Sequence, residues 1–404
     1  MYTAISALDS YQNDLDVIAN NLANANTTGY KASRVLFTDQ YSQLISPGAS
    51  PSTALGGVNP TQIGLGVKMG EVTPQFTQGT LQSTGNDLDM AIQGDGFFVY
   101  DQGLAQRYSR DGSLKVDANG TLVNSSTGLH VQGWMADAEG NIDTTVQPTD
   151  ITINTDQAQA QTTGNAVFGG NLDSSTAVGD SVVTSIGVYD ALGKLRNVDV
   201  TFTRTNATDW SWKVDATGAN DTATGDGTIS FTNGQNPTVT VTDAISITDS
   251  TGAEPDVNMK IDLSKLTQLS EDSSVSMTSQ DGLPAGTVSS LYVSPKDGTI
   301  SLVYSNGIIQ PVAQLALARF TNPSGLISTG DSTYEKGLNS GEAEIGTANS
   351  GGRGTISSGS LEASNVDMAQ EFTNMMLAQR GFQASSRVIT TSDTLMQTLV
   401  NLIQ

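Results

Sequence analysis

The sequence predicts a mixed α and β fold in which a terminal α-helical coiled coil is joined to nested, mainly β domains. These domains are expected to consist of antiparallel strands with a sandwich or barrel character, in an elongated molecule. Three observations predict this fold class. Apolar residues recur every seven positions at both ends of the chain, short alternating runs separated by Gly, Asn and Asp fill the middle, and the strand pattern returns after a long polar insertion.

The order of these patterns predicts that each domain is inserted into the one before it, so that the two ends of the chain meet. Changes in composition give the domain boundaries. The predicted domains are a terminal coiled coil of 1–30 with 362–404, an extended connecting segment of 31–75 with 340–361, a first β domain of 76–149 with 284–339, and an inserted outer β domain of 150–283.

The start of the chain predicts an amphipathic helix of about 25 residues. Its apolar side chains form two adjacent columns with a spacing of seven, made of Leu8, Leu15 and Leu22 and of Ala4, Tyr11, Ile18 and Ala25. Burying so few side chains returns less free energy than the backbone entropy lost when the segment becomes ordered. The helix therefore needs a partner, which is the other end of the chain, another copy of the chain, or both.

The end of the chain predicts a second helix from about Asn365 onward, because Ser364 and Asp367 resemble a helix-start box. Two apolar columns follow, made of Met368, Met375, Phe382, Ile389, Met396 and Ile403 and of Val388, Leu395 and Leu402. Small or polar side chains accompany the first column and let a partner helix approach closely, namely Ala378, Ser385 and Ser392.

Residues 32–75 are expected to form an extended segment with an exposed loop rich in Pro, Gly and Ser at 46–60. Gly64, Gly66 and Gly70 do not form a dinucleotide-binding loop, because residue 69 is Met and no capped helix follows. Residues 78–134 predict antiparallel strands joined by tight turns, with strands at 90–92, 97–100, 113–116, 121–123 and 130–134.

Two acidic groups in this region resemble chemical sites. Asp117 and Asn119 resemble the start of a calcium loop, but the third acidic position and the distant Glu are missing, so a hairpin turn is expected. Asp87, Asp89 and Asp95 supply carboxylates that could be paired in catalysis. No other candidate chemistry lies near them in the sequence, so we expect turn and surface roles.

The insertion predicts a β-barrel or sandwich. Residues 181–216 give two alternating strands across a turn at 191–194 and a third, Trp-rich strand, and shorter strands continue to about Met277. Residues 289–320 give strong strands that should return the chain to the first β domain. Residues 321–363 are rich in Gly and Ser, and with little to bury they are expected to find partners or to stay mobile.

The composition argues against several classes of function. The net charge of −23 disfavours binding to nucleic acid or to an anionic membrane. With no Cys and a single His, His130, the chain lacks the residues for a thiolate metal site or a Ser/His/Asp device. The first cation is Lys31, so no cleaved secretory signal is expected. We therefore expect no catalytic, cofactor-binding or metal-binding residues.

A specific resemblance begins where the first predicted helix ends. The residues that carry it are Asn20, Asn21, Ala23, Asn24, Thr28, Gly29, Tyr30 and Lys31. Together with 79–98, 108–112 and 359–402, they resemble the flagellar rod and hook protein family. The large insertion makes the chain more similar to the hook proteins of this family than to the distal rod proteins, which lack so large an insert.

The resemblance implies a structural subunit of the bacterial flagellar hook, not an enzyme, with no cofactor. It implies self-assembly through paired terminal helices into a short curved tube that transmits torque from rod to filament as a flexible universal joint. The implied partners are further copies of the chain, the distal rod, hook cap and hook-filament junction proteins, and the flagellar type III export apparatus. The implied location is extracellular, on the basal-body side of the filament, after export without a cleaved signal peptide.

The heptad columns and the resemblance together predict an interface between copies on the terminal helices. Its predicted residues are Leu8, Tyr11, Leu15, Ile18, Leu22, Met368, Met375, Phe382, Ile389, Leu395, Met396, Leu399 and Leu402. Two alternatives remain at this point. One is a distal rod protein, which forms a rigid driveshaft, and the other is a secreted β-rich adhesin or carbohydrate-active enzyme with coiled ends.

Overall fold

The computed structural model describes residues 2–48, 50, 56–103, 105–218, 221–249 and 256–403, with the backbone alone described for 242–244 and 403. The chain divides into two compact units. Unit 1 comprises Met1–Ile153, Tyr292–Ser301 and Pro311–Gln404, and unit 2 comprises Asn154–Leu291 and Leu302–Gln310. Both units are therefore built from separate stretches of the chain. The fold class is the predicted one, a pair of terminal helices with a mainly β body.

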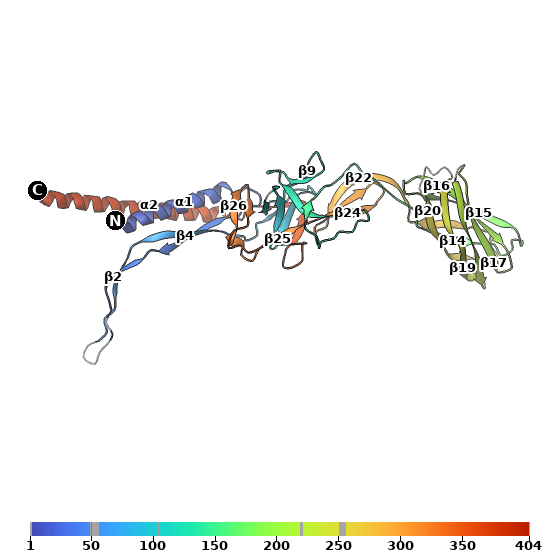
Figure 1. Ribbon diagram of the computed structural model, residues 1–404, viewed down its shortest axis with the longest axis horizontal. Coiled ribbons are helices and arrows are strands. Elements are labelled where there is room, and N and C mark those ends of the chain that lie inside the picture. The colour runs from blue at the N-terminus through green and yellow to red at the C-terminus, as the bar shows by residue number, and fades with distance from the viewer. Residues whose placement is uncertain are drawn as a thin grey trace. The chain divides into compact units, whose positions relative to one another are not determined.

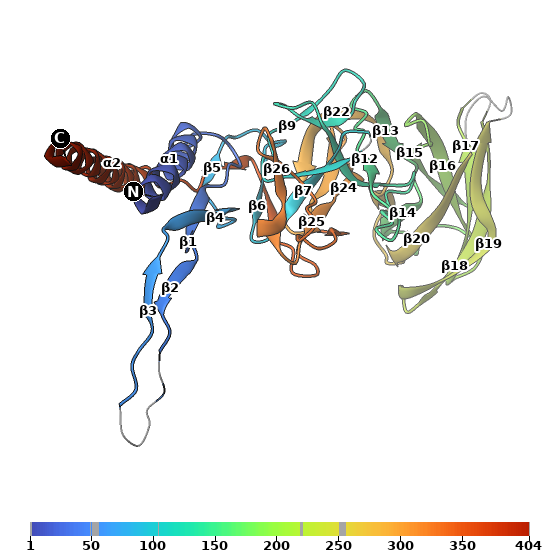
Figure 2. The same cartoon turned by 60° about the vertical axis from the view of Figure 1, so that its left-hand side comes forward.

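The two terminal helices pair with each other. In unit 1, α1 (Tyr2–Ala23) and α2 (Met368–Ile403) lie side by side and run in opposite directions (Figures 1 and 2). The ring of Tyr11 packs on Gly381, and Asn21 lies beside Glu371 near the start of α2. The end of the chain is thus one of the partners that the heptads of α1 require.

The second helix begins three residues later than the sequence predicted, at Met368 instead of Asn365. Asp367 caps it, because its Oδ1 accepts the backbone N–H groups of Ala369 at 2.9 Å and Gln370 at 3.2 Å. Ser364, which was expected to cap the helix, instead accepts the N–H of Val366 at 3.3 Å. Asp367, which the sequence placed inside the first turn, is therefore the residue that caps the start of the helix.

The segment after α1 forms a two-stranded ribbon, which the sequence did not predict. β1 (Ser33–Asp39) pairs antiparallel with β4 (Val67–Pro74), and β2 (Ser42–Ser46) pairs with β3 (Thr61–Gly64), as Figure 2 shows. The predicted loop at 46–60 connects β2 to β3, and its residues 49 and 51–55 lie outside the described part of the chain. Gly64, Gly66 and Gly70 belong to this ribbon.

Most of the first β domain lies in unit 1, although 284–291 and 302–310, which the sequence placed in that domain, belong to unit 2. The strands predicted within 90–134 are confirmed. The early strands of this domain are β5 (Leu81–Ser83), β6 (Met90–Gln93), β7 (Phe97–Asp101), β8 (Gln106–Ser109), β9 (Leu114–Val116), β10 (Leu122–Asn124), β11 (His130–Met135) and β12 (Thr149–Asp150). Its core contains edge-to-face aromatic pairs, with ring centroids 5.9 Å apart for Phe97 and Phe320 and 4.8 Å apart for Tyr108 and Phe320.

The chain returns to this domain after the insertion, as predicted. β24 (Ile309–Leu315) pairs with β11, and β25 (Leu317–Arg319) pairs with β7. The elements around and after them are β22 (Leu283–Val293), β23 (Thr299–Tyr304), the 3₁₀ turn η1 (Pro323–Gly325), β26 (Ile327–Gly330), β27 (Thr333–Glu335), β28 (Glu344–Gly346), β29 (Thr355–Ser358) and β30 (Ser360–Glu362).

The expectation that residues 321–363 have little to bury was wrong. β29 pairs with β6 and β30 pairs with β5. Leu326, Tyr334 and Ile356 are buried within this stretch, and so is the charged Glu362. Gly and Ser residues serve turns between the short strands. Leu326, Tyr334 and Ile356 reach the core, whereas Ile327 and Leu338 stay exposed.

Unit 2 contains the predicted β-barrel-like insertion. Its strands are β13 (Ala158–Gln161), β14 (Asn165–Asn171), β15 (Ser181–Tyr189), β16 (Leu195–Arg204), β17 (Asp209–Ala216), β18 (Asp221–Thr232), β19 (Gln235–Asp249), β20 (Val257–Thr267) and β21 (Ser276–Gln280). The sheet order is β15-β16-β17-β18-β19-β20-β14-β21, and its edge strands β15 and β21 contact each other. Trp210, Trp212, Phe168 and Phe202 are fully buried in its core.

Candidate functional site

The seam between α1 and α2 is built from small side chains. Ala4 and Ile18 of α1 and Ala378 of α2 are buried, and Ser385 and Ser392 are half-buried. A Cβ atom at Gly381 would lie 2.5 Å from the ring of Tyr11, so a glycine is needed there for the two helices to approach. The close approach predicted from Ala378 and its neighbours is therefore confirmed. Such a seam buries little apolar surface.

The predicted interface residues fall into two groups in the subunit. Ile18 is buried, and a half-buried group flanks the seam, namely Leu8, Tyr11, Leu15, Leu22, Met375 and Ile389. The exposed group comprises Met368, Phe382, Leu395, Met396, Leu399 and Leu402. The pairing of α1 with α2 therefore leaves much of the heptad surface uncovered.

Further apolar residues on the helices are exposed although no predicted column contains them, namely Ile5 on α1 and Phe372, Met376, Leu377 and Val400 on α2. Val388, which belongs to a predicted column, is exposed as well. The helix pair thus presents apolar side chains on several faces at once. A surface of this kind is typical of a protein that binds further chains.

The ribbon carries a second exposed apolar surface. Large apolar side chains that are more than one-third exposed occur along all four strands and beside them, namely Leu36, Phe37, Tyr41, Leu44, Ile45, Ile63, Leu65, Val67, Met69 and Val72. A two-stranded sheet without a layer to cover it is marginally stable in water. The ribbon therefore resembles the helix pair in presenting apolar surface that nothing within the described subunit covers.

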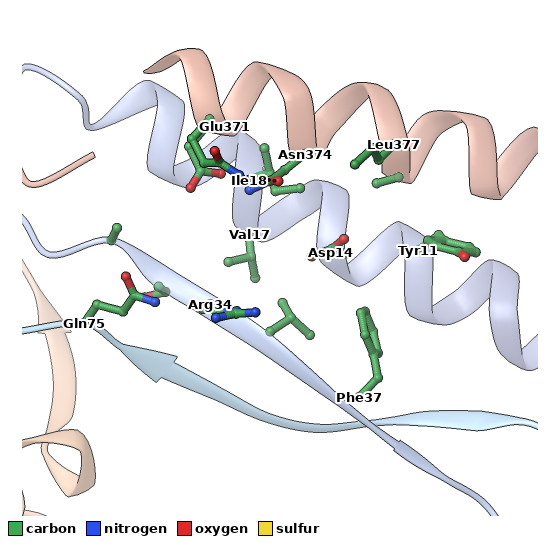
Figure 3. A pocket seen from close by; sticks show the side chains of 15 residues that line it. Tyr11, Asp14, Val17, Ile18, Arg34, Phe37, Gln75, Glu371, Asn374 and Leu377 are labelled. Carbon is green, nitrogen blue, oxygen red and sulfur yellow. Dashed lines mark hydrogen bonds between the residues drawn. The ribbon is translucent and has the colours of Figure 1, made fainter. Parts of the chain in front are cut away.

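A groove of about 670 Å³ lies where α1, α2 and β1 meet (Figure 3). Asp14 of α1 and Glu371 of α2 face it from the helices, and Arg34 of β1 faces it from the ribbon. Burial raises the pKa of Asp14. Burial also raises the pKa of Glu371, and the nearby charges of Asp14 and Asp367 raise it further. The groove therefore carries two carboxyl groups whose ionised forms are destabilised, a setting that favours an approaching cation.

The signature residues 20–31 form a junction inside the subunit, in which Asn21, Gly29 and Lys31 are buried. Asn21 is 1% exposed, and its side chain bonds both backbone groups of Ser33, accepting the N–H at 2.9 Å and donating to the carbonyl at 2.8 Å. Tyr30 Oη donates to Asn21 Oδ1 at 3.2 Å. Asn21 therefore fixes the angle at which the chain leaves α1 and enters β1.

The other signature residues support this turn. Asn24 Nδ2 donates to Asn20 Oδ1 at 2.9 Å, and Thr27 Oγ1 donates to Asn24 Oδ1 at 3.1 Å. Ala23 is exposed and Thr28 is half-buried. Gly29 has a φ of +67°, and a Cβ atom there would lie 2.5 Å from the backbone nitrogen of Asp111. Only glycine fits this position without strain.

The junction is centred on a fully buried ion pair. Lys31 Nζ lies 2.6 Å from Glu362 Oε1, and both side chains are 0% exposed. Lys31 also donates to the carbonyl of Thr77 at 2.8 Å, and the same Glu362 oxygen accepts the N–H of Gly79 at 2.8 Å. Arg110 Nη1 lies 3.5 Å from Glu362 Oε2. One carboxylate therefore serves two buried cations.

Asn365 and Gly29 tie the same segments together through the backbone. Asn365 Oδ1 accepts the N–H of Ala32 at 2.8 Å, and its Nδ2 donates to the carbonyl of Gln75 at 2.8 Å. The N–H of Gly29 donates to the carbonyl of Glu362 at 2.8 Å. We name the set of 29–32, 75–79, Arg110 and 362–365 the chain-end cluster.

The chain-end cluster and the helix seam should differ in stability. In the isolated subunit, we expect the amides of 29–33 and 362–365 to be protected from hydrogen exchange, because the buried ion pair of Lys31 and Glu362 and the hydrogen bonds of Gly29 and Asn365 to the backbone anchor them. The amides of α1 and α2 away from this cluster should exchange at least tenfold faster, because the seam buries little apolar surface. Exchange measured on dilute subunits would test this. Equal protection of both regions would show that the seam is self-sufficient and that the helices need no further copies.

The remaining candidate residues make ordinary surface and turn contacts where the structure describes them. His130 Nδ1 pairs with Asp150 Oδ2 at 2.7 Å on the surface, and Asp117 Oδ1 accepts the N–H groups of Asn119 and Thr121, as expected of a hairpin turn. Asp89 lies at a β-bridge with Ser113. Within the described residues, no group of three or more His, Cys, Asp or Glu side chains could hold a metal ion. None of the described helices is long and apolar enough to cross a membrane.

Four family models match successive parts of the chain. Their descriptions are Flagella basal body rod protein for residues 1–31, Flagellar hook protein FlgE/F/G D1 domain for 91–164, Flagellar basal body protein FlaE D2 domain for 171–283, and Flagellar basal body rod FlgEFG protein C-terminal for 357–402.

Relatives match along the full length. The Flagellar hook protein FlgE of Treponema pallidum (strain Nichols) is 36% identical over 458 residues, covering 100% of this chain and 99% of the relative. The Flagellar basal-body rod protein FlgG of Bacillus subtilis (strain 168) is 29% identical over 403 residues, covering 100% of this chain and 98% of the relative. The crystal structure of the Helicobacter pylori flagellar hook protein FlgE2 matches the fold with a TM-score of 0.52 at 16% identity, over 70% of this chain and 100% of that one.

Proposed function

The chain belongs to the flagellar hook protein family and is a structural subunit of the flagellar hook, and from this premise we propose that its copies polymerise through α1 and α2 into a short curved tube. The observation that carries the proposal is the heptad surface that the α1–α2 pair leaves exposed, including Leu395, Leu399 and Leu402. Covering this surface requires further chains. Another copy of the chain supplies a matching heptad surface, because every copy carries the same two helices.

The predicted interface residues have different roles in this proposal. Ile18, and in part Leu8, Tyr11, Leu15, Leu22, Met375 and Ile389, support the pairing of helices within one subunit, whereas the exposed group on α2 contacts neighbouring copies. The signature residues 20–31 set the direction of the helix pair through the chain-end cluster. We therefore assign them a positioning role inside each subunit.

The helices and unit 2 should give the tube different mechanical properties. Packed apolar columns resist sliding, so the helical part of the polymer should be torsionally stiff. Unit 2 has its own closed core around Trp210 and Trp212, so it can stay folded while its surface contacts change. Weak polar contacts between such units would let the tube bend while it rotates. The tube would then transmit torque from rod to filament as a flexible universal joint.

The proposed partners are the proteins that adjoin an assembled hook and those that export its subunits. They are the distal rod, hook cap and hook-filament junction proteins at the ends of the polymer, and the flagellar type III export apparatus during export to the outside of the cell. The absence of Cys from the sequence suits passage as an unfolded chain, because no disulfide has to be reduced. The proposal assigns no catalytic role to the chain.

The distal rod protein was the alternative from the sequence. The relatives disfavour it, because the hook protein of Treponema pallidum is 36% identical to this chain and the rod protein of Bacillus subtilis is 29% identical. The β-rich adhesin or carbohydrate-active enzyme is not supported by any of the relatives described above.

Electron microscopy of polymer grown from the purified chain tests the proposed function. We expect tubes that curve or adopt several supercoiled forms, because compliant contacts between copies of unit 2 allow the length of each protofilament to vary. Straight tubes of a single form would indicate a rigid driveshaft instead. A chain that stays monomeric at all concentrations, with α1 and α2 fully protected, would contradict polymerisation through the helices.

A further inference from the structure

Four charged side chains on the terminal helices, two acidic and two basic, form no ion pair with any residue that the structure describes. Asp9 and Asp16 of α1 and Arg380 and Arg387 of α2 are exposed, and no ion pair involves them among the described residues. The two aspartates are seven residues apart, and so are the two arginines. Each pair therefore forms a short column along one face of its helix, about 10 Å long at 1.5 Å per residue.

Both charged columns point away from the seam between α1 and α2. At about 100° per residue, Asp9 and Asp16 lie about 180° and 160° around the helix from the buried Ile18. Arg380 and Arg387 lie at the same two angles from the buried Ala378. The aspartates and arginines of one subunit therefore cannot meet each other across its own seam.

Exposed apolar side chains accompany both columns. Ile5 lies one turn from Asp9 and is 51% exposed, and Met376 lies one turn from Arg380 and is 54% exposed. Charges that flank apolar positions are typical of coiled-coil surfaces, where they select the partner and fix its register. The two faces are thus complementary in charge, in spacing and in apolar content.

We propose that the Asp9/Asp16 face of α1 in one copy docks on the Arg380/Arg387 face of α2 in a second copy of this chain. This inference rests on the proposed function, because it names the contact by which neighbouring copies recognise each other. The contact is heterologous, so it can repeat without closing, as an open helical polymer requires. Copies in such a polymer point the same way, so the two docked helices are antiparallel, as they are within one subunit.

The pairing fixes an offset between neighbours. Within one subunit, Tyr11 lies opposite Gly381, so the numbers of facing residues add up to about 392. Pairing Asp9 with Arg387 and Asp16 with Arg380 makes the facing numbers add up to 396. A neighbour is therefore displaced by four residues along the helix axis, which is about 6 Å. This displacement can be measured in a reconstruction of the tube.

Charge reversal tests the contact. The variants Asp9→Arg/Asp16→Arg and Arg380→Asp/Arg387→Asp should each raise the critical concentration for polymerisation at least tenfold at low salt, because like charges then face each other. An equimolar mixture of the two variants should polymerise at close to the unmodified concentration, since every α1 again meets an oppositely charged α2. High salt should reduce the defect of each variant, because the interaction is screened.

The control is Lys115→Asp/Lys296→Asp, which changes the net charge as much as the arginine variant does and replaces exposed lysines of the β region. It should polymerise normally. The proposal is overturned if the mixture assembles no better than its components, or if only the arginine variant is defective, since the arginines would then meet another surface such as Asp393. Failure of the unmodified chain to polymerise would instead contradict the proposed function itself.

Discussion

Subunits with Leu395→Asp are expected to fold normally but to polymerise only at a concentration about two to four orders of magnitude higher than the unmodified chain. Leu395 is 61% exposed in the subunit, so the substitution costs the subunit little. In the proposed polymer, a neighbouring copy would cover this leucine. Losing its burial costs about 1.5–3 kcal/mol, and desolvating an unpaired carboxylate adds at least about 1–3 kcal/mol. Since 1.4 kcal/mol is about a tenfold change in an equilibrium constant, the sum gives the stated shift.

Sedimentation of polymer at a series of subunit concentrations measures the effect, with amide exchange as the test of folding. A matched control is Val183→Asp, which places the same charge on an equally exposed apolar residue of unit 2, where Val183 is 55% exposed. This control should polymerise within a few-fold of the unmodified chain. Normal polymerisation of the Leu395 variant would show that the exposed column of α2 is not covered by other copies.

Leu15→Asp and Ile389→Asp should also prevent assembly, but they are less informative. Both residues are half-buried beside the seam of the subunit. An aspartate at either position would weaken the pairing of α1 with α2 as well as the contacts between copies. The Leu395 variant separates the weakening of the seam from the loss of contacts between copies, because Leu395 is exposed and takes no part in the seam.

The sequence predicted those parts of the fold that are encoded locally. The helices follow from heptads such as Leu8, Leu15 and Leu22, because a helical period needs only neighbouring residues. The strands of the first β domain and the insertion follow from alternation between turns such as Asn119-Gly120. The α1–α2 seam was partly predictable, since small residues beside the apolar column indicated where a partner could approach.

The ribbon and the chain-end cluster could not be predicted in the same way. β1 and β4 are exposed along most of both faces, so no alternation of buried and exposed residues marks them as strands. The ion pair of Lys31 and Glu362 joins residues 331 positions apart, and nothing local in a Gly- and Ser-rich stretch indicates which charge meets which. The signature was recognisable as a pattern, but its role depends on these long-range contacts.

Glu362→Ala is expected to destabilise unit 1 by about 3–5 kcal/mol, because it leaves buried cations without their counter-ion. Lys31 would keep only its hydrogen bond to the carbonyl of Thr77. Arg110 would lose the carboxylate nearest to it. This arginine is 2% exposed, and its guanidinium carbon lies 5.3 Å from the centre of the Phe97 ring. The N–H of Gly79 would also lose its acceptor. Urea unfolding followed by a probe in unit 1 measures the loss.

The exposed pair of Glu344 and Arg319 gives the control. Their charged atoms lie 3.9 Å apart and both side chains are more than two-fifths exposed, so Glu344→Ala should change the stability by less than about 0.5 kcal/mol. Equal effects of the two substitutions would contradict the central role of Glu362. The double variant Lys31→Met/Glu362→Leu should recover part of the loss, because apolar side chains can fill the site without burying a charge.

The pH dependence of the Glu362 variant distinguishes a buried charge from a simple loss of packing. Burial already lowers the pKa of Lys31 below its ordinary value of 10.5, although Glu362 opposes that shift. Without Glu362, the folded state should favour the neutral amine still more strongly. A lysine whose folded pKa is lowered costs stability below that pKa, and the cost disappears as the pH rises toward the unfolded value. The variant should therefore regain stability as the pH rises toward the ordinary lysine pKa of 10.5. A loss that is independent of pH would assign the effect to packing, and the junction between the helix pair and the first β domain would then depend on side-chain packing and not on this ion pair.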